Sequence, residues 1–303
     1  AVAAIVSEAR SDSTIPQLVV NDPLVAFQTI AREHRRTFSG KVIGVTGSAG
    51  KTSTKNILQR VLGDRTFATE GNFNNHLGVP LMLTQLDAEL HDYAVIEAGI
   101  SGRGEMDVLA GMIEPDMAIV TLIGQAHTEN LNDLNGVAQE KSRLPATVSE
   151  QGRVFLPNQV AEYPQFTELK GKQTVVSAVE VLSGTVAEDM VRFLTIPTGN
   201  STVLSVAFGM HAPESYTLVR VSKGMVQNAV LAIAVARVCG VSASVVQERL
   251  SEWKPDAMRG EVREVNGNLV YLDCYNANPA SMHDALDAFV DMTCDVDSRL
   301  YVL

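Results

Sequence analysis

The stretch GVTGSAGKTSTKN, residues 44–56, decides the fold of this 303-residue chain. It overlaps the β-branched run KVIGVT at 41–46 and leads into the apolar-periodic segment 51–62, which predicts a strand, a glycine turn and a helix. A glycine loop in this setting can cradle phosphate with its backbone N–H groups. However, Val45 stands where the common loop G-x-x-x-x-G-K-[ST] has its first glycine.

The loop and the start of the helix hold the candidate nucleotide-binding residues. Gly47 and Gly50 let the backbone approach phosphate oxygens, Lys51 supplies a charge, and the Thr52 hydroxyl can bind magnesium. A glycine turn that binds nothing is the open alternative. The full set is Gly47, Ser48, Ala49, Gly50, Lys51, Thr52 and Ser53.

Buried strands alternate with helices beyond this loop. YAVIEAG at 93–99 and MAIVTLIG at 117–124 are near-continuous apolar runs, typical of strands covered on both faces of a parallel sheet. The alternation predicts an α/β fold with a mostly parallel, doubly wound sheet that binds ligands at the carboxyl ends of its strands. Short alternating runs between about 153 and 221 predict a smaller antiparallel sheet alongside. Further helices are expected at 22–36, 75–90, 134–149, 224–239, 242–252 and 280–292, and a hairpin at Asn266-Gly267.

Composition excludes several classes of function. The net charge is −11, and no cluster of Lys and Arg interrupts it, so the chain has no basic face for nucleic acid. The longest apolar stretch, AVLAIAVA at 229–236, is too short to cross a bilayer. The three cysteines are far apart and form no disulfide framework. We therefore expect a cytoplasmic protein without membrane insertion.

Three charged or titratable residues are expected at or near the carboxyl edge of the predicted sheet. Glu97 ends one buried strand and could hold magnesium, directly or through water; an exposed acid is the alternative. His127 follows the next strand, although a lone histidine is more often structural. Lys141 lies on the following helix, where the residues alone predict a solvated surface charge.

Two asparagine-rich segments and one arginine are ambiguous. GNFNNHLGVP at 71–80 and YNANP at 275–279 could contact a polar substrate, or could form Asx-turns and helix caps. Arg259 could reach a phosphate or remain a surface charge.

Together these motifs resemble one family. GVTGSAGKTS, EGNFNNHLGVP, VIEAGISGRGEM, IGQAHTENL with GVAQEKSRL, QNAVLAIAVA, MRGE and DCYNANPASM occur in the order found in the Mur ligases, the ATP-dependent amide-bond synthetases of peptidoglycan assembly. NFNNHLGVP and YNANPASM are similar to the MurF type, which joins UDP-N-acetylmuramoyl-tripeptide to D-alanyl-D-alanine. The resemblance covers about 40–303. The family uses a shorter loop, G-x-x-G-K-[ST], which accounts for Val45.

The resemblance implies a role for each motif residue. Lys51, Lys141 and His127 would be catalytic, and two Mg²⁺ ions would be held by Thr52, Glu97, His127 and Lys141, with Lys141 carbamylated. ATP would bind the glycine loop, and its remaining contacts would be Asn228, Arg259, Asp273, Tyr275, Asn276 and Asn278. The muramyl-peptide substrate would face Asn72, Asn74 and Asn75. Departures from the family pattern fall at Gly224-Met225 before the adenine helix, at Leu272 and at Arg143.

The family is built from three domains, which sets our expectation for the ends of the chain. Residues 1–36 would be a remnant of an N-terminal domain for the UDP-substrate, 37–297 the central ATP-binding ligase domain, and 298–303 the first strand of a missing C-terminal Rossmann-like domain. We expect a monomer, with little or no turnover by this excerpt alone. Two alternatives remain: a sister ligase for another acid and amine, as in folyl-polyglutamate or cyanophycin synthesis, and a non-catalytic nucleotide-binding homologue.

Overall fold

The computed structural model describes residues 2–125, 128–184, 186–294 and 298–302. Over these residues nine strands form one sheet in the order β11-β10-β9-β8-β7-β6-β3-β5-β4. Its strands are β3 (Lys41–Thr46), β4 (Thr66–Ala68), β5 (Tyr93–Glu97), β6 (Met117–Val120), β7 (Arg153–Pro157), β8 (Lys172–Ala178), β9 (Met190–Thr198), β10 (Ser201–Phe208) and β11 (Glu214–Val219). Every neighbouring pair from β9 to β4 in this order is parallel, which confirms the predicted α/β class.

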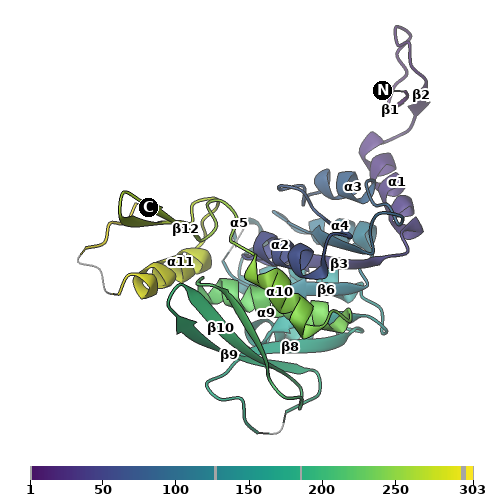
Figure 1. The fold of residues 1–303 in the computed structure, drawn as a ribbon. Helices are drawn as coiled ribbons and strands as arrows, with labels where there is room; N and C mark the ends of the chain where they lie inside the picture. The colour runs from purple at the N-terminus through teal and green to yellow at the C-terminus, as the bar shows by residue number, and fades with distance from the viewer. Residues whose placement is uncertain (1, 126–127, 185, 295–297, 303) are drawn as a thin grey trace.

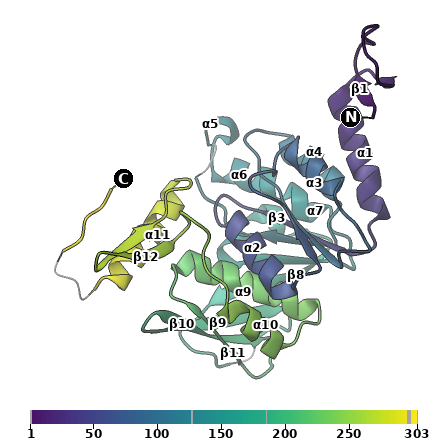
Figure 2. The ribbon, with the colours of Figure 1, turned by 45° about the horizontal axis from the view of Figure 1, so that its top comes forward.

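Helices cover both faces of the sheet, as Figures 1 and 2 show. One apolar cluster packs α2 (Lys51–Leu62), α9 (Lys223–Val238) and α10 (Ala243–Ser251) against one face. A second cluster lies on the other face and includes α1 (Pro23–Thr37), α3 (Gly78–Leu83), α4 (Glu105–Ile113), α6 (Leu134–Lys141), α7 (Arg143–Ala146) and α8 (Asn158–Ala161). Burial on both faces explains why the central strands read as continuous apolar runs.

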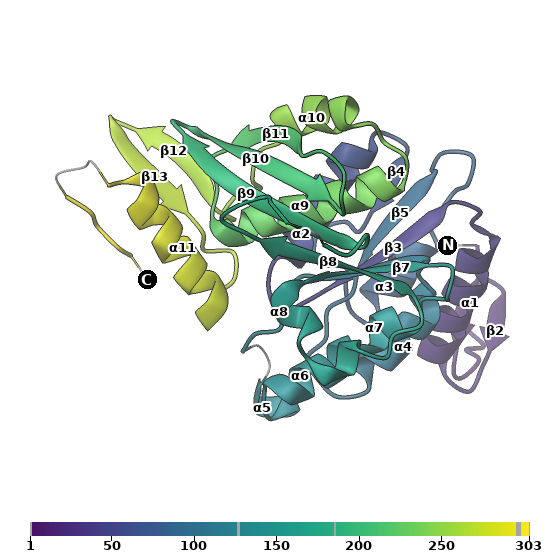
Figure 3. The ribbon, with the colours of Figure 1, turned by 90° about the horizontal axis from the view of Figure 1, so that it is seen from below.

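The prediction of antiparallel strands from 153 onward was wrong for the first two of them. β7 and β8 pair in parallel because α8 and the short 3-10 helix Pro164–Phe166 carry the chain back across the sheet between them. Within this sheet, antiparallel pairing is confined to the β9–β10 and β10–β11 pairs. They extend the parallel sheet through the β8–β9 pair, so both parts share one hydrogen-bonded sheet (Figure 3).

The helix predicted over 134–149 is divided, and the break sets where Lys141 lies. α6 ends at Lys141, and α7 begins at Arg143. Pro145 has no N–H to donate to the carbonyl four residues earlier, which belongs to Lys141, so a continuous helix cannot form there. The helix predicted over 75–90 is likewise short, since α3 covers only 78–83.

Small elements stand at opposite ends of the molecule (Figure 1). The parallel pair β1 (Ala4–Val6) and β2 (Gln17–Val19) precedes α1, and the hairpin β12 (Glu261–Val265) and β13 (Asn268–Leu272) precedes α11 (Pro279–Met292). Asn266 and Gly267 both have positive φ, as predicted for the hairpin turn. The strand expected in RLYVL is not formed over 298–302, because this segment has no strand partner and leaves Leu300 and Val302 more than four-fifths exposed. The helix α5 (Thr128–Leu131) completes the fold.

Candidate active site

One cavity of about 930 Å³ lies where the glycine loop, the loop 72–76, the N-terminus of α9, the linker before β12 and α11 come together. Every described residue that was predicted to belong to the site lines it: Gly47, Ser48, Ala49, Gly50, Lys51, Thr52, Ser53, Asn72, Asn74, Asn75, Glu97, Lys141, Asn228, Arg259, Asp273, Tyr275, Asn276 and Asn278. His127 lies outside the described residues.

The glycine loop is packed so tightly that only glycine fits at two positions. Gly47 has φ +149, and a Cβ there would lie 1.9 Å from Thr121 Oγ1. Gly50 has φ +79, and a Cβ there would lie 2.6 Å from Asn228 Nδ2. Ser48 is also anchored, because its N–H donates to Leu122 O at 2.8 Å. The loop is therefore held in shape by β6 and α9 before any ligand binds.

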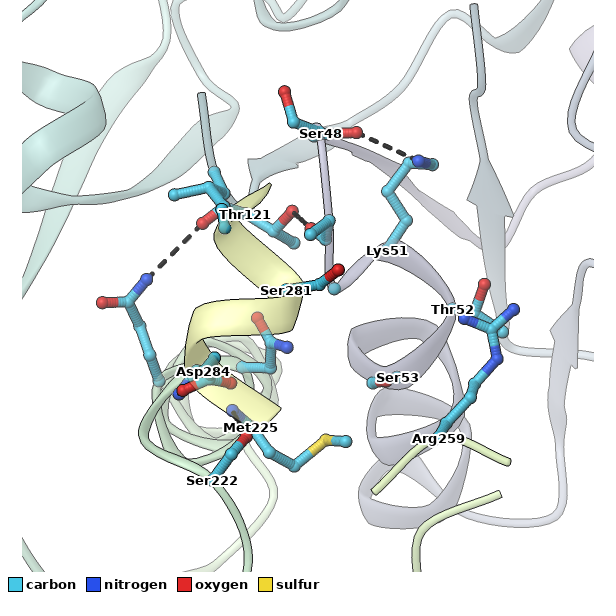
Figure 4. A pocket seen from close by; sticks show the side chains of 18 of the residues that line it. Ser48, Lys51, Thr52, Ser53, Thr121, Ser222, Met225, Arg259, Ser281 and Asp284 are labelled. Atoms are coloured by element: carbon cyan, nitrogen blue, oxygen red, sulfur yellow. Dashed lines mark hydrogen bonds between the residues drawn. The ribbon is translucent and has the colours of Figure 1, made fainter. Parts of the chain in front are cut away.

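Lys51 reaches back along this loop from the first turn of α2 (Figure 4). Its Nζ donates to Gly47 O at 3.0 Å. Burial lowers the pKa of Lys51, and the nearby Glu97 carboxylate opposes this shift. The ammonium group is thus placed at the centre of the loop, where it can meet an anion.

Glu97 is buried at the carboxyl end of β5, with only 2% of its surface exposed. Its Oε2 accepts a hydrogen bond from Thr52 Oγ1 at 3.0 Å, and its Oε1 accepts one from Asn74 Nδ2 at 2.8 Å. An exposed strand-end acid, the alternative considered from the sequence, is not what the structure has. A buried carboxylate beside a hydroxyl provides the oxygen atoms that hard cations prefer.

Lys141 is buried as well, at 2% exposure, so the prediction of a solvated surface charge was wrong. Burial lowers its pKa to about 7, with a smaller contribution from the charge of Lys51. Glu140 opposes the shift, while its own carboxylate accepts a hydrogen bond from Met106 N–H. At neutral pH a large share of Lys141 is therefore a free amine, the form that can react as a nucleophile.

The opposite wall of the cavity comes from the linker before β12, from residues 273–278 between β13 and α11, and from α11; Figure 4 labels Arg259 on the linker and Asp284 on α11. The Arg259 guanidinium lies over the Tyr275 ring, 3.8 Å from its centroid. Burial, together with Asp284, raises the pKa of Asp273 to about 6. Arg259 opposes this shift. This wall therefore presents a cation, an aromatic face and acidic groups to the cavity.

Several asparagines already have structural partners. Asn75 Oδ1 accepts from Gly78 N–H at 2.8 Å near the start of α3, and Asn278 Oδ1 accepts from Ser281 N–H at 3.0 Å in the capping box of α11. Asn276 Oδ1 accepts from the next backbone N–H, that of Ala277. The Asx-turn and capping alternative therefore holds for these three, while Asn74 instead contacts Glu97.

Some residues that support the site were not predicted from the sequence. Thr121 donates its hydroxyl to Ala49 O and so braces the glycine loop. Asn56, on α2, donates to Asp256, whose carbonyl in turn accepts from the Arg259 N–H at 3.1 Å. Thr121 could have been found because it follows β6 directly, whereas 200 residues separate Asn56 from Asp256 and no local pattern pairs them.

Neither a membrane span nor a carboxylate–histidine metal cluster is found in the described part of the chain. No helix there combines the length and apolar character needed to cross a bilayer. Among the same residues, no three His, Cys, Asp or Glu side chains gather as a metal site would need.

Comparison with known proteins places the chain in a family. Residues 45–236 match the model of the Mur ligase middle domain. The UDP-N-acetylmuramoyl-tripeptide–D-alanyl-D-alanine ligase of Bacillus subtilis is 31% identical over 277 residues, covering 89% of this chain and 57% of that protein.

Solved structures agree with this match. MurF from Acinetobacter baumannii superposes with a TM-score of 0.84 at 30% identity, over 94% of this chain and 62% of that chain. MurF ligase from Thermotoga maritima, in complex with ADP, superposes with a TM-score of 0.82 at 25% identity, over 96% of this chain and 66% of that chain. The chain thus spans about three fifths of the length of these relatives. The match over 45–236 confirms what the order of motifs indicated: the chain belongs to the Mur ligase family.

Proposed function

We propose that this chain carries the ATP-binding centre of a ligase that joins D-alanyl-D-alanine to UDP-N-acetylmuramoyl-tripeptide. The observation that carries the proposal is the meeting of Lys51, Thr52, Glu97 and Lys141 at one cavity, at the ends of the parallel strands. The names of the relatives support the choice of substrates. The sister-ligase and non-catalytic alternatives gain no support from these names.

The ligation would proceed in two steps. The terminal carboxylate of the tripeptide attacks the γ-phosphorus of ATP, which releases ADP and leaves an acyl phosphate. The amine of D-alanyl-D-alanine then attacks the acyl carbon, the C–O bond to phosphate breaks, and the amine loses a proton. Because both partners in the first step are anions, the site must lower their repulsion.

The glycine loop and Lys51 supply the first part of that stabilisation. The loop backbone and the Lys51 ammonium hold the phosphates, while Asn228 and Asp273 border the nucleoside, and Arg259 adds a second cation near the phosphates. Tyr275, Asn276 and Asn278 would contact the nucleotide, and Asn72, Asn74 and Asn75 would face the muramyl-peptide substrate; all six line the cavity.

We expect two Mg²⁺ ions, and the oxygen donors of Thr52 and Glu97 fit one of them. Thr52 and Glu97 would hold the first, because their oxygen atoms lie 3.0 Å apart and Mg²⁺ prefers oxygen ligands. His127 and Lys141 would hold the second. When bound, such ions screen charge between carboxylate and phosphate as Lewis acids.

Lys141 would serve as a metal ligand after carbamylation. The free amine attacks CO₂, a C–N bond forms and one proton is released, which turns a cation into a carboxylate-bearing anion. Its depressed pKa, about 7, supplies the free amine for this step. A ¹³C NMR signal from labelled bicarbonate that disappears in Lys141→Met would support the assignment; an unchanged signal would contradict it.

The remaining proposals concern organisation. We assign 37–297 to the central ATP-binding domain, 1–36 to the end of an N-terminal UDP-substrate domain, and 298–303 to the start of a C-terminal Rossmann-like domain. We infer that a further, C-terminal domain would close over the site and exclude water. The ligase would act as a monomer in the cytoplasm.

The test is the release of phosphate and the mass of the product. The 303-residue chain and the longest natural protein that contains it are incubated with ATP, magnesium and both substrates, and then with folate and glutamate instead. We expect product only from the muramyl-tripeptide and D-alanyl-D-alanine, and little turnover by the shorter chain. Product from folate and glutamate alone would refute the proposal. So would a chain that binds no ATP, or one whose ATP binding is not reduced by Lys51→Ala.

A further inference from the structure

Strand β4 leaves the sheet beside Glu97 through an exchange of hydrogen-bond acceptors. Pairing with β5 is regular up to Ala68, which lies opposite Val95, and the Thr69 N–H still donates to Val95 O at 3.0 Å. In a regular parallel ladder the next bond would run from the Glu97 N–H to the Thr69 carbonyl. Instead, the Glu97 N–H donates to the hydroxyl oxygen of Thr69, at 2.9 Å.

The Thr69 carbonyl accepts a hydrogen bond from a lysine instead. Lys55 lies one turn after Lys51 on α2, and its Nζ donates to Thr69 O at 2.6 Å. Lys55 is 5% exposed and Thr69 is 1% exposed, so solvent cannot easily replace either group. The ammonium therefore takes the acceptor that would otherwise continue the ladder, and the threonine hydroxyl satisfies the N–H that is left over.

This exchange releases the loop that borders the carboxylate. After Thr69 the chain turns away from β5, and Asn74 then returns to donate to Glu97 Oε1 at 2.8 Å. The loop is fixed a second time by Gly99 N–H, which donates to Asn74 O at 2.8 Å. Glu97 is thus held at its backbone by Thr69 and at its two carboxylate oxygens by Asn74 and Thr52.

We propose that Lys55 and Thr69 are positioning residues for Glu97: together they divert β4 from the sheet, so that the loop 70–77 closes over the carboxylate and the carboxylate faces Thr52. The structural part stands on the hydrogen bonds alone. Its consequence for magnesium rests on the proposed function. Neither residue touches the cavity, since the lining includes neither of them.

The structural part is tested by hydrogen exchange of the Glu97 amide, followed by NMR in the metal-free and nucleotide-free chain. Thr69→Val keeps the shape of the side chain but removes the acceptor, so we expect exchange at least about tenfold faster. Thr69→Ser restores a hydroxyl and should return the rate to within about twofold of wild type.

Thr66→Val is the matched control on the same strand. Thr66 is 4% exposed, and its hydroxyl has no partner among the described residues, so its loss should leave the Glu97 amide unchanged. Exchange that speeds up equally in Thr66→Val and Thr69→Val would show a general loosening of β4 and would overturn the proposal.

Lys55→Met makes the sharper test, because it frees the Thr69 carbonyl. The Glu97 N–H can then donate to that carbonyl as in a regular ladder. Adding Thr69→Val to Lys55→Met should therefore change the exchange rate of the Glu97 amide by less than about twofold. An equal effect of Thr69→Val in both backgrounds would contradict the exchange of acceptors.

Magnesium-dependent nucleotide binding tests the consequence. Lys55→Met should raise the Mg²⁺ concentration needed for half-maximal binding of an ATP analogue by about tenfold, while magnesium-independent binding changes little. Unchanged magnesium dependence would overturn the positioning role. A wild-type chain that binds no analogue would refute the proposed function instead, and the exchange results would still stand.

Discussion

At the scale of single residues, burial rather than residue type decides the chemistry of this site. Lys51, Glu97 and Lys141 are ordinary charged residues in the sequence, but the fold removes Glu97 and Lys141 almost completely from solvent. Burial lowers the pKa of both lysines, so a small change in their surroundings should alter their protonation. For Glu97, such a change should alter its contacts with Thr52 and Asn74.

Lys141→Met should change how stability depends on pH. Burial places the pKa of Lys141 near 7, below its ordinary value of about 10.4, so between these values the unfolded state binds more protons than the folded state. The free energy of unfolding of wild type therefore rises with pH across this window. The stabilisation of Lys141→Met relative to wild type should be largest at or below pH 7 and shrink toward pH 10.

Urea denaturation in CO₂-free buffers at pH 6, 8 and 10 measures this difference. Lys170→Met, at an exposed position, is the control and should keep the wild-type slope. A difference between Lys141→Met and wild type that does not vary with pH would show that the Lys141 amine is not titrating in this range.

Gly50→Ala should damage the glycine loop more than strain alone explains. Gly50 has φ +79, and an added Cβ would meet Asn228 at 2.6 Å. Gly240→Ala is the matched control, because Gly240 has φ +86 and nothing within 4 Å. We expect about 1 kcal/mol of destabilisation in Gly240→Ala from the left-handed conformation, and at least about 1 kcal/mol more in Gly50→Ala from crowding.

Thermal denaturation and titration with an ATP analogue separate these two effects. Gly240→Ala should bind the analogue as wild type does, while Gly50→Ala should bind at least about tenfold more weakly. Equal losses of stability in the two variants, with binding retained, would mean that the loop tolerates a side chain at position 50.

At the scale of elements, α2 is the centre of the site. Its first turn carries Lys51 and Thr52, and its second turn carries Lys55, which holds the end of β4, and Asn56, which holds the linker loop through Asp256. One helix therefore connects the glycine loop to both flanks of the cavity, so losing an anchor on its second turn should affect binding without unfolding the sheet.

Asn56→Ala tests the anchor on the linker side. Without the Asn56–Asp256 hydrogen bond, the loop that carries Arg259 should shift, and the affinity for an ATP analogue should fall by roughly five- to tenfold. Asn158→Ala, which removes a surface contact with Glu162, is the control. Calorimetry gives both affinities, and circular dichroism checks that helix content is unchanged. Equal affinity in both variants would show that the anchor does not position Arg259.

The sequence predicted elements well where the pattern is local, and failed where neighbours far along the chain decide the outcome. The strand–loop–helix at 41–62 and the turn at Asn266-Gly267 follow from local patterns. β7 and β8 were misassigned as antiparallel because an alternating run looks the same in either direction, and only the short helices between them fix the direction. The strand expected in RLYVL is not formed over 298–302, where no described strand pairs with it.

The same limit applies to the site. A lysine on a helix reads alike whether it faces water or a cavity, so Lys141 became a candidate only through the resemblance to the Mur ligases. Lys55 and Asn56 were missed because their partners, Thr69 and Asp256, are specified by tertiary packing. The glycine loop was found because its spacing and its helix are contiguous in the sequence.

At the scale of the whole molecule, the sheet brings side chains from distant segments to one edge. The glycine loop follows β3, Glu97 ends β5, and Lys141 comes from α6 on the second face, yet all three line one cavity. Parallel strands make this possible, because their carboxyl ends meet at the same edge. We propose that this edge holds a metal–nucleotide complex between Thr52, Glu97 and Lys141.

The decisive experiment is a crystal structure with Mn²⁺ and a non-hydrolysable ATP analogue, because manganese can be located by anomalous scattering. We expect phosphates on the loop 47–52, one manganese ion contacted by Thr52 and Glu97, and a second beside a carbamylated Lys141. Phosphates bound away from the loop, or a nucleotide in the loop whose manganese touches neither Thr52 nor Glu97, would contradict the proposal.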